Sequence, residues 1–490
     1  MTFTEVQMEL SQGKTVDSTE FQKMIDGNFG SGNATGTIGG GNYIITITRN
    51  GTNYKMGNSG KIETLDELPI DFEPGVLEKS GNTYTINSIE DLVAFSYNVN
   101  SGTESYEGKT VTLGRNLDFQ DDNSYVDANS KYKKDENGYI PDSTSEETIK
   151  SLMINKNKDG FIQIGYGSNS FNGSFNGQGK SVSNLYIKSD SNEGAGFFGY
   201  TKESIQISNL SILMCDIKSN GITGGIVGNG YNNKIINCHV NGNISNSGNN
   251  SFGGIVGGSG VVLNCYNSAN IIGNGTTGGI AGIGGTVINC YNCGDITSNY
   301  SYAGGITGSS ANVTNCYNNG NIIANSYAGG ITSSGGTISN CYNYKDVTSS
   351  YAGGITSSGT VNNCFNSGTI TVTGNNPVGG IVSYGGNITN CHNIGNIIGL
   401  SSQLCGEIIG AGSDVETSNN YLIKTDENNN SLNANPKGAI GKSQAEMDEI
   451  MSVENFVNLM NSYVEENNAD STKTPLKRWK VENGMPVFAE

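Results

Sequence analysis

The sequence predicts an all-β protein, a right-handed parallel β-helix (solenoid) of about 9–10 coils with small α/β flanking caps. The prediction rests on a repeat of about 25 residues, on short β-rich runs between Gly and Asn, and on an apolar fraction of 34% with 71 glycines. An Asn-Cys pair recurs, with its cysteine at Cys238, Cys265, Cys290, Cys316, Cys341, Cys364 and Cys391. Such repeats contact only their neighbours and bury a continuous core between them.

Three further columns stay in register with this cysteine. A Gly-Gly-Ile element recurs in every repeat, and an Ile or Val lies three residues before each cysteine. Another apolar column lies six residues after it, at Ile244, Ile271, Ile296, Ile322, Val347, Ile370 and Ile397. Each repeat thus holds three β runs that are too short for free-standing hairpins and leave no room for a helix. Winding each repeat into one coil and stacking the coils satisfies every column.

The Asn before each cysteine and the glycine pair before each Ile predict the corners of the coil. Core positions at −3 and 0 have opposite strand parity, so a bend must lie between them. Asparagine tolerates left-handed backbone there, and stacked Asn side chains can bond to each other along the column. At the glycine corner, a Cβ would obstruct the turn.

Ten cysteines need an explanation in this scheme. Seven form the ladder, Cys215 is expected to extend it by one coil, and Cys293 and Cys405 stand apart. Adjacent parallel strands lie about 4.8 Å apart, which exceeds the Cβ separation of about 3.5–4.5 Å in a disulfide. We therefore expect reduced, buried cysteines that act as small hydrophobes, with disulfides as the alternative. A zinc site at Cys290 and Cys293 would lack the usual second pair.

Charge is low in the repeats and acidic overall. The net charge of −18 argues against nucleic acid or an anionic membrane surface as a partner. No apolar run is long enough for membrane insertion, and residues 1–14 do not resemble a secretory signal. Between residues 221 and 400 the only charged residues are Lys234, Asp295, Lys345 and Asp346.

Four segments are predicted along the chain. Residues 1–63 hold a helix that starts at Asp17-Ser-Thr-Glu20 and a β-hairpin around Asn50-Gly51, and residues 64–158 form a linker and an N-terminal cap with one helix. The parallel β-helix occupies residues 159–424. Residues 425–490 form a C-terminal cap, in which a capping box at residues 443–446 starts a helix that runs to about Met460. We expect this helix and Trp479 to cover the last coil, because an open solenoid end exposes strand backbone.

Several segments resemble the GLUG repeats of bacterial surface proteins. Gly-Ile-Val-Gly at residues 225–228 and 254–257, Gly-Ile-Ala-Gly at 279–282 and Gly-Ile-Thr-Gly at 305–308 match the motif. Later coils depart from it and read Gly-Ile-Thr-Ser at 330–333 and 354–357 and Gly-Ile-Val-Ser at 380–383. Residues 87–99 and 116–119 are similar to the opening helix and first strand of that family, and residues 478–487 to its last segment. The resemblance implies an adhesin-like protein at the cell surface or outside the cell. Some proteins with these repeats are IgA1-cleaving metallopeptidases.

Residues 17–56 look like the C-terminal part of a type IV pilin or pseudopilin. This resemblance rests on the expected helix and on the alternating residues of the hairpin. It implies that the solenoid is carried on a pilus, with pilus subunits as partners.

Catalysis, metal binding and cofactors are not expected. The zinc-binding His-Glu-x-x-His helix of a metallopeptidase is absent, and the histidines His239 and His392 lie six coils apart in one column. Asp295 and Asp346 occupy a turn position where other repeats have Asn, so we interpret them as turn residues rather than as acid–base groups. The acidic segment 118–142 does not match the spacing of a calcium loop.

Two aromatic columns are the candidate binding face. One follows the ladder cysteine and comprises Tyr266, Tyr291, Tyr317, Tyr342 and Phe365; the other precedes Ala-Gly-Gly and comprises Tyr302, Tyr327 and Tyr351. Aromatic rings one coil apart could stack on sugars or anchor a protein, and they could equally serve only to stabilise the strands.

We therefore expect a non-catalytic adhesin-like solenoid that binds a host glycan or glycoprotein. The alternatives are a polysaccharide-degrading or phage-tailspike solenoid and an accessory domain of a surface peptidase. The charge-poor face of the coils favours the adhesin, because polysaccharide cleavage needs clustered carboxylates.

Overall fold

A computed structural model describes most of the chain. It covers residues 17–29, 34–39, 42–49, 52–57, 62–64, 77–119, 132–135, 138–141, 161–189, 194–309, 311–398, 405–406, 408–411, 417–418, 421–422, 453–469, 475–482 and 485–489. The chain divides into two compact units, residues 1–72 and 73–490. No helix of the described residues is both long enough and apolar enough to cross a membrane.

The first unit contains helix α2 (Ser18–Phe29) and a four-stranded antiparallel sheet. Its strands, in sheet order, are β1 (Ala34–Gly39), β2 (Asn42–Arg49), β3 (Thr52–Gly57) and β4 (Ile62–Thr64). The Asp17 carboxylate accepts hydrogen bonds from the backbone N–H groups of Thr19 and Glu20, which begins the helix and lowers the pKa of Asp17. Strands β2 and β3 pair from Arg49 opposite Thr52, so the predicted hairpin is confirmed.

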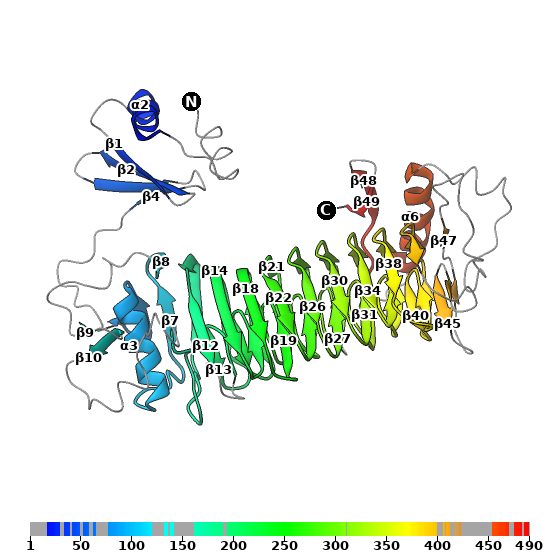
Figure 1. The fold of residues 1–490 in the computed structure, drawn as a ribbon, viewed down its shortest axis with the longest axis horizontal. Helices are drawn as coiled ribbons and strands as arrows, with labels where there is room; N and C mark the ends of the chain where they lie inside the picture. The colour runs from blue at the N-terminus through cyan, green and yellow to red at the C-terminus, as the bar shows by residue number, and fades with distance from the viewer. Residues whose placement is uncertain are drawn as a thin grey trace. The chain divides into compact units, whose positions relative to one another are not determined.

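The second unit begins with a small cap. It comprises β5 (Glu78–Ser80), β6 (Thr83–Ile86), α3 (Ile89–Asn100), β7 (Thr110–Leu113) and β8 (Leu117–Asp118), followed by the hairpin strands β9 (Tyr132–Asp135) and β10 (Gly138–Pro141). A reciprocal capping box between Ser88 and Asp91 begins α3. Phe95 on this helix makes edge-on contact with Phe171 and Phe198 of the first coils, so α3 closes the N-terminal end of the core (Figure 1).

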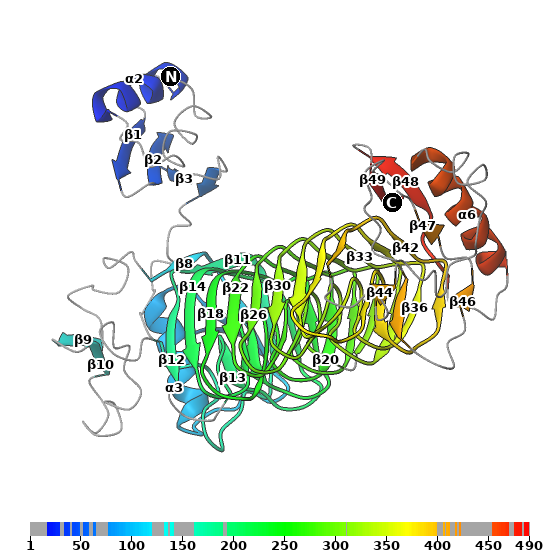
Figure 2. The same cartoon turned by 45° about the vertical axis from the view of Figure 1, so that its right-hand side comes forward.

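The rest of this unit is a parallel β-solenoid of about ten turns, which confirms the predicted fold class (Figure 2). The first turns use the long strands β11 (Ser174–Ser183), β12 (Tyr186–Ser189), β14 (Gln206–Ser219) and β18 (His239–Asn246). Short strands form two further parallel pairs, β13 (Phe198–Tyr200) with β16 (Val227–Asn229) in the first turns and β40 (Val382–Tyr384) with β45 (Ile409–Ala411) in the last.

Each later coil contributes strands to four parallel stacks. The first stack is β17 (Asn233–Ile236), β20 (Gly260–Leu263), β24 (Thr286–Ile288), β28 (Ala311–Thr314), β32 (Gly336–Ser339), β36 (Thr360–Asn362), β41 (Ile388–Thr389) and β46 (Thr417–Ser418). The second is β21 (Tyr266–Asn267), β25 (Tyr291–Asn292), β29 (Tyr317–Asn318), β33 (Tyr342–Asn343), β37 (Phe365–Asn366), β42 (His392–Asn393) and β47 (Tyr421–Leu422).

The third and fourth stacks complete the coil. The third is β22 (Asn270–Gly273), β26 (Ile296–Ser298), β30 (Ile322–Ala324), β34 (Val347–Ser349), β38 (Ile370–Val372) and β43 (Ile397–Ile398). The fourth is β15 (Thr223–Gly224), β19 (Ser251–Gly253), β23 (Thr276–Gly278), β27 (Tyr302–Gly304), β31 (Tyr327–Gly329), β35 (Tyr351–Gly353), β39 (Val378–Gly379) and β44 (Cys405–Gly406). The columns of Ile, Val and Cys predicted from the repeat lie inside the coils and are buried.

Both predicted corners are present. The Asn residues that precede the ladder cysteines, from Asn237 to Asn390, have φ between 52° and 56°. Each amide Nδ2 donates to the Asn Oδ1 of the preceding coil over 2.6–3.2 Å. At the glycine corner, a Cβ on Gly279 would lie 2.1 Å from the carbonyl oxygen of Gly305, a distance that no side chain tolerates.

The ladder cysteines are free and buried, as predicted, but Cys215 does not extend their column. The Nδ2 of Asn237 donates to Asn209, so Leu210 occupies the cysteine position of that coil. A register shift between Ile212 and Cys215 places Cys215 opposite Gly242 instead. An irregularity of this kind adds residues to one strand and leaves no mark in the residue types. Counting residues along the repeat therefore placed Cys215 in the wrong column.

The C-terminal cap consists of α6 (Val453–Ala469) and the antiparallel strands β48 (Trp479–Glu482) and β49 (Met485–Phe488). The helix runs beyond the predicted end at Met460, because Val457 and Val464 lie on one buried face that extends past that residue. The predicted capping box at residues 443–446 lies outside the described part of the chain. The cap was expected on the last coil. Instead, Trp479 packs against Phe365, two coils before the last pair of strands, β46 and β47, so the cap covers the side of the stack (Figure 1).

Candidate binding surface

The first aromatic column follows the corner Asn by two residues and lies on the outside of the second strand stack. The rings of Tyr266, Tyr291, Tyr317 and Tyr342 are nearly parallel, with centroids 4.9, 4.8 and 4.9 Å apart and interplanar angles of 6°, 2° and 7°. His239 stacks on Tyr266 at the N-terminal end of this column, with the ring centroids 3.7 Å apart. All four tyrosines are half-buried.

This arrangement restricts how the column can bind. Neighbouring rings cover each other's faces, so an interior tyrosine presents its edge and its hydroxyl rather than a free face. The hydroxyls are protonated at neutral pH and can donate and accept hydrogen bonds, and burial raises the pKa of Tyr266 and Tyr317 further. Stacking of a sugar on an interior ring, one of the two binding modes expected from the sequence, is therefore sterically excluded.

Phe365, the last member predicted for this column, is not available to a ligand. Its side chain is fully buried, with Trp479 at 6.4 Å and 72° on one side and His392 stacked at 5.7 Å along the column. Tyr342 also packs against the cluster that Phe365 forms with the cap residues Val457, Val464, Leu476 and Trp479. The open part of the column is thus Tyr266, Tyr291 and Tyr317.

The corner asparagines form a second element of this surface, which sequence reasoning assigned to the turn and to bonds along the column but not to binding. Asn264 and Asn289 are exposed and Asn315 is half-buried, whereas Asn340, Asn363 and Asn390 are buried toward the cap. Trp479 Nε1 donates to Asn363 Oδ1 over 2.7 Å, and Asn363 Nδ2 donates to the carbonyl oxygen of Lys477 over 3.2 Å. One feature of the sequence could have indicated this contact. The chain has a single Trp, and it comes after the repeats that carry the corner Asn column.

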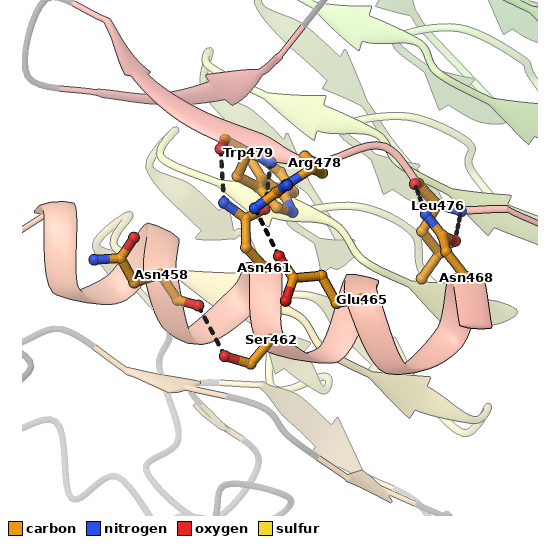
Figure 3. A network of polar contacts seen from close by, with 8 residues as sticks. All are labelled: Asn458, Asn461, Ser462, Glu465, Asn468, Leu476, Arg478 and Trp479. Atoms are coloured by element: carbon orange, nitrogen blue, oxygen red, sulfur yellow. Dashed lines mark hydrogen bonds and ion pairs between the residues drawn. The ribbon is translucent and has the colours of Figure 1, made fainter.

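Helix α6 holds the cap strand in place for these contacts (Figure 3). Asn461 Nδ2 donates to the carbonyl of Trp479 over 2.8 Å, and its Oδ1 accepts the Trp479 N–H over 2.6 Å. Asn468 exchanges the same pair of bonds with Leu476, at 2.8 and 2.7 Å. Glu465 pairs with Arg478 on the exposed side of the cap.

The second aromatic column belongs to the fourth strand stack. Tyr302, Tyr327 and Tyr351 are half-buried and stack with centroids 5.3 and 4.5 Å apart. Within one coil, strand β26 separates Tyr291 of the first column from Tyr302 of the second. The two columns are therefore distinct surfaces and do not form one face.

The acidic residues of the coils are engaged in turns. Asp295 Oδ1 accepts the backbone N–H of Asn321 over 2.8 Å and its side-chain Nδ2 over 3.1 Å. Asp346 Oδ1 accepts the backbone N–H of Thr369 over 2.9 Å. Each carboxylate thus links one coil to the next, as an Asn does at this position in other repeats.

Metal ligands do not converge in the described part of the chain, where no group of three or more His, Cys, Asp or Glu side chains comes together. Cys290 is buried in the core, whereas Cys293 is exposed, so the two thiols face different environments. Most of the acidic segment 118–142 lies outside the described residues.

Fold and surface together define a repetitive β-solenoid with stacked polar and aromatic columns. No protein-family model matches this sequence, and no curated protein sequence matches it, so the GLUG and pilin-like resemblances remain predictions. A solved structure named "IgA1 Protease" is similar, with a TM-score of 0.37 and 13% identity over 73% of this chain. The match spans 27% of that protease chain.

Proposed function

We propose that this chain is a non-catalytic, adhesin-like solenoid, secreted or at the cell surface, that binds a host glycan or glycoprotein. The pilin-like resemblance of residues 1–63 adds pilus subunits as further candidate partners. Nucleic acid is not part of the proposal, because the chain carries a net charge of −18. Membrane insertion is not part of it either, because no apolar run of this sequence is long enough.

The observation that carries the proposal is the regular spacing of half-buried tyrosines along the coils. A linear ligand that lies along the first aromatic column meets an equivalent ring edge and hydroxyl every 4.8–4.9 Å. Tyrosine offers large contact area together with a hydrogen-bonding hydroxyl at little cost in side-chain entropy, so repeated tyrosines suit weak contacts that add along a polymer.

The main alternative is a polysaccharide-degrading or tailspike-type solenoid. Glycoside cleavage needs two carboxyl groups free to exchange protons on either side of the scissile bond. Asp295 and Asp346 instead accept backbone hydrogen bonds from the next coil, and Asn321 lies between them in the column. This favours binding without cleavage, and it applies equally to a binding accessory domain of a surface peptidase.

The test is an array of glycans and host glycoproteins probed with the full chain, in which every positive spot is also examined for released sugar. Binding without release supports the proposal and identifies the ligand class. Release of reducing sugar, or the absence of any binding to the array, would refute it.

A further inference from the structure

The C-terminal cap shows what the surface beside the first aromatic column can bind. The cap strand lies across one corner Asn and the next aromatic residue, and it uses an indole N–H, a peptide carbonyl and an edge-on ring contact. The same pair of columns stays exposed or half-buried at Asn264 and Tyr266, Asn289 and Tyr291, and Asn315 and Tyr317. We call these six residues the open Asn–Tyr surface.

Hydrogen-bonding capacity distinguishes the open and covered asparagines. A primary amide has two N–H donors and two acceptor lone pairs. Asn363 uses all four: Nδ2 donates to Asn340 and Lys477, and Oδ1 accepts from Asn390 and Trp479. Within the part of the chain that the structure describes, Asn289 uses two, one bond to Asn264 and one from Asn315. Each open Asn thus keeps one donor and one acceptor, the pair that the cap engages at Asn363.

We propose that the open Asn–Tyr surface binds an extended polypeptide segment of a partner protein that presents a tryptophan. The proposal rests on the proposed function in treating the coils as a binding surface, and it names the protein part of a glycoprotein as the partner at this site. An extended segment fits because two groups from one short stretch of the cap reach Asn363, the backbone carbonyl oxygen of Lys477 and the indole N–H of Trp479.

Tryptophan fits better than the other aromatic residues for a chemical reason. Its indole N–H is a donor only, and it matches the spare Oδ1 lone pair, while its ring packs edge-on against the column. The open surface is also uncharged, so this recognition depends on desolvated hydrogen bonds and ring contacts rather than on Coulomb attraction. Binding is therefore expected to persist at high salt.

The experiment uses a fluorescein-labelled peptide of residues 475–482 as the probe and the full chain as the receptor. In the full chain the covered site is already filled by its own cap at high effective concentration, so the added peptide reports on the open surface. Fluorescence anisotropy is measured at high ionic strength, which screens attraction between this basic peptide and the acidic chain. We expect a saturable rise that weakens about tenfold when alanine replaces tryptophan in the peptide.

The receptor variants locate the site. Asn289→Gly with Asn315→Gly removes both amides yet keeps residues that accept positive φ, and it should weaken peptide binding about tenfold. Thr297→Ala with Thr348→Ala, on the outward face of the third stack, is the matched control and should bind as the wild type does. If the double variant folds poorly, Asn315→Gly alone takes its place. Because it leaves Asn289 intact, the single variant should give a smaller loss of peptide affinity.

Two results would overturn the inference: no saturable binding to the wild-type chain, or equal affinity for wild type and a folded Asn variant. The glycan array separates this from the proposed function. Peptide binding with no array binding would refute only the proposed adhesin function. Array binding that survives in the Asn variants, together with no peptide binding, would refute only the inference that the open Asn–Tyr surface binds a tryptophan peptide.

Discussion

Trp479 Nε1 donates a hydrogen bond of 2.7 Å to Oδ1 of Asn363, a residue 116 positions earlier in the chain. This bond joins the C-terminal cap to the corner column of the solenoid. The indole also fills the space beside Phe365, so one side chain fixes the cap both by shape and by a polar contact.

Replacing this tryptophan should release the cap and leave the coils folded. We expect Trp479→Ala to weaken cap docking by about 3 kcal/mol or more, and Trp479→Phe by about 1 kcal/mol, because phenylalanine keeps a ring but loses the N–H. Hydrogen exchange followed by mass spectrometry measures this as lost protection in β48 and at Phe365. Equal loss of protection in β22 and β26 would contradict independent folding of the coils.

A second Asn column is buried inside the second stack, where each amide Nδ2 donates to the Asn Oδ1 of the next coil; its members are Asn267, Asn292, Asn318, Asn343, Asn366 and Asn393. This inner ladder should be more sensitive to substitution than the corner Asn column. Asn318 is fully buried, donates to Gly320 and Asn343, and accepts from Asn292. Asn318→Ala leaves several of these groups without partners and should lower the free energy of unfolding by about 3 kcal/mol. The exposed Asn289→Gly should cost about 1 kcal/mol, and denaturant titration compares the two. Similar costs would show that the inner ladder is dispensable.

Stability should fall in mild acid because of His239. Burial lowers the pKa of this histidine from 6.5 to about 4. Between these values the unfolded chain binds a proton that the folded chain does not, so the free energy of unfolding decreases as the pH drops from about 6.5 to 4. His239→Tyr, which continues the tyrosine column, should reduce this pH dependence. The comparison is of melting temperatures at pH 7 and 4.5, and an unchanged pH dependence in the variant would refute the assignment.

Ligand affinity should depend on the open tyrosines more than stability does. Tyr291→Ala with Tyr317→Ala should weaken binding of any array-positive ligand about tenfold while costing about 1 kcal/mol of stability per ring. Tyr342→Ala is a poor substitute, because Tyr342 packs against the cluster formed by Phe365 and the cap. Binding kinetics and thermal melts are run on the same samples. A large fall in melting temperature with unchanged affinity would assign these rings to the scaffold.

Thiol accessibility tests the cysteine ladder. Among the nine cysteines whose side chains the structure describes, only Cys293 is exposed, and burial raises the pKa of the Cys316 thiol. We expect a thiol reagent to modify Cys293 rapidly in the native protein and the ladder only after denaturation, with peptide mapping to locate the adduct. Rapid modification of Cys290 or Cys316 in the folded chain would contradict a closed core.

Much of the solenoid was predictable because its information is local and repeated. Asn289, Gly279 and Ile280 each recur at the same position of every coil, so parity and backbone preference fix the corners and the core. Cys215 was misplaced because the first coils contain a register shift that breaks the count. The burial of Phe365 was missed for a different reason: it depends on Trp479, a contact between distant segments that no period encodes.

The equivalence of successive coils also bears on how such a chain changes in length. Ladder cysteines lie 23–27 residues apart, and every column passes from one coil to the next through the same contacts. An in-frame duplication or deletion of one whole repeat between Cys265 and Cys316 would therefore rejoin each column with itself. Such a change alters the number of open asparagine and tyrosine positions and keeps both caps. The length of the binding surface and its avidity could therefore evolve through the number of coils, without any change in the sequence of a coil.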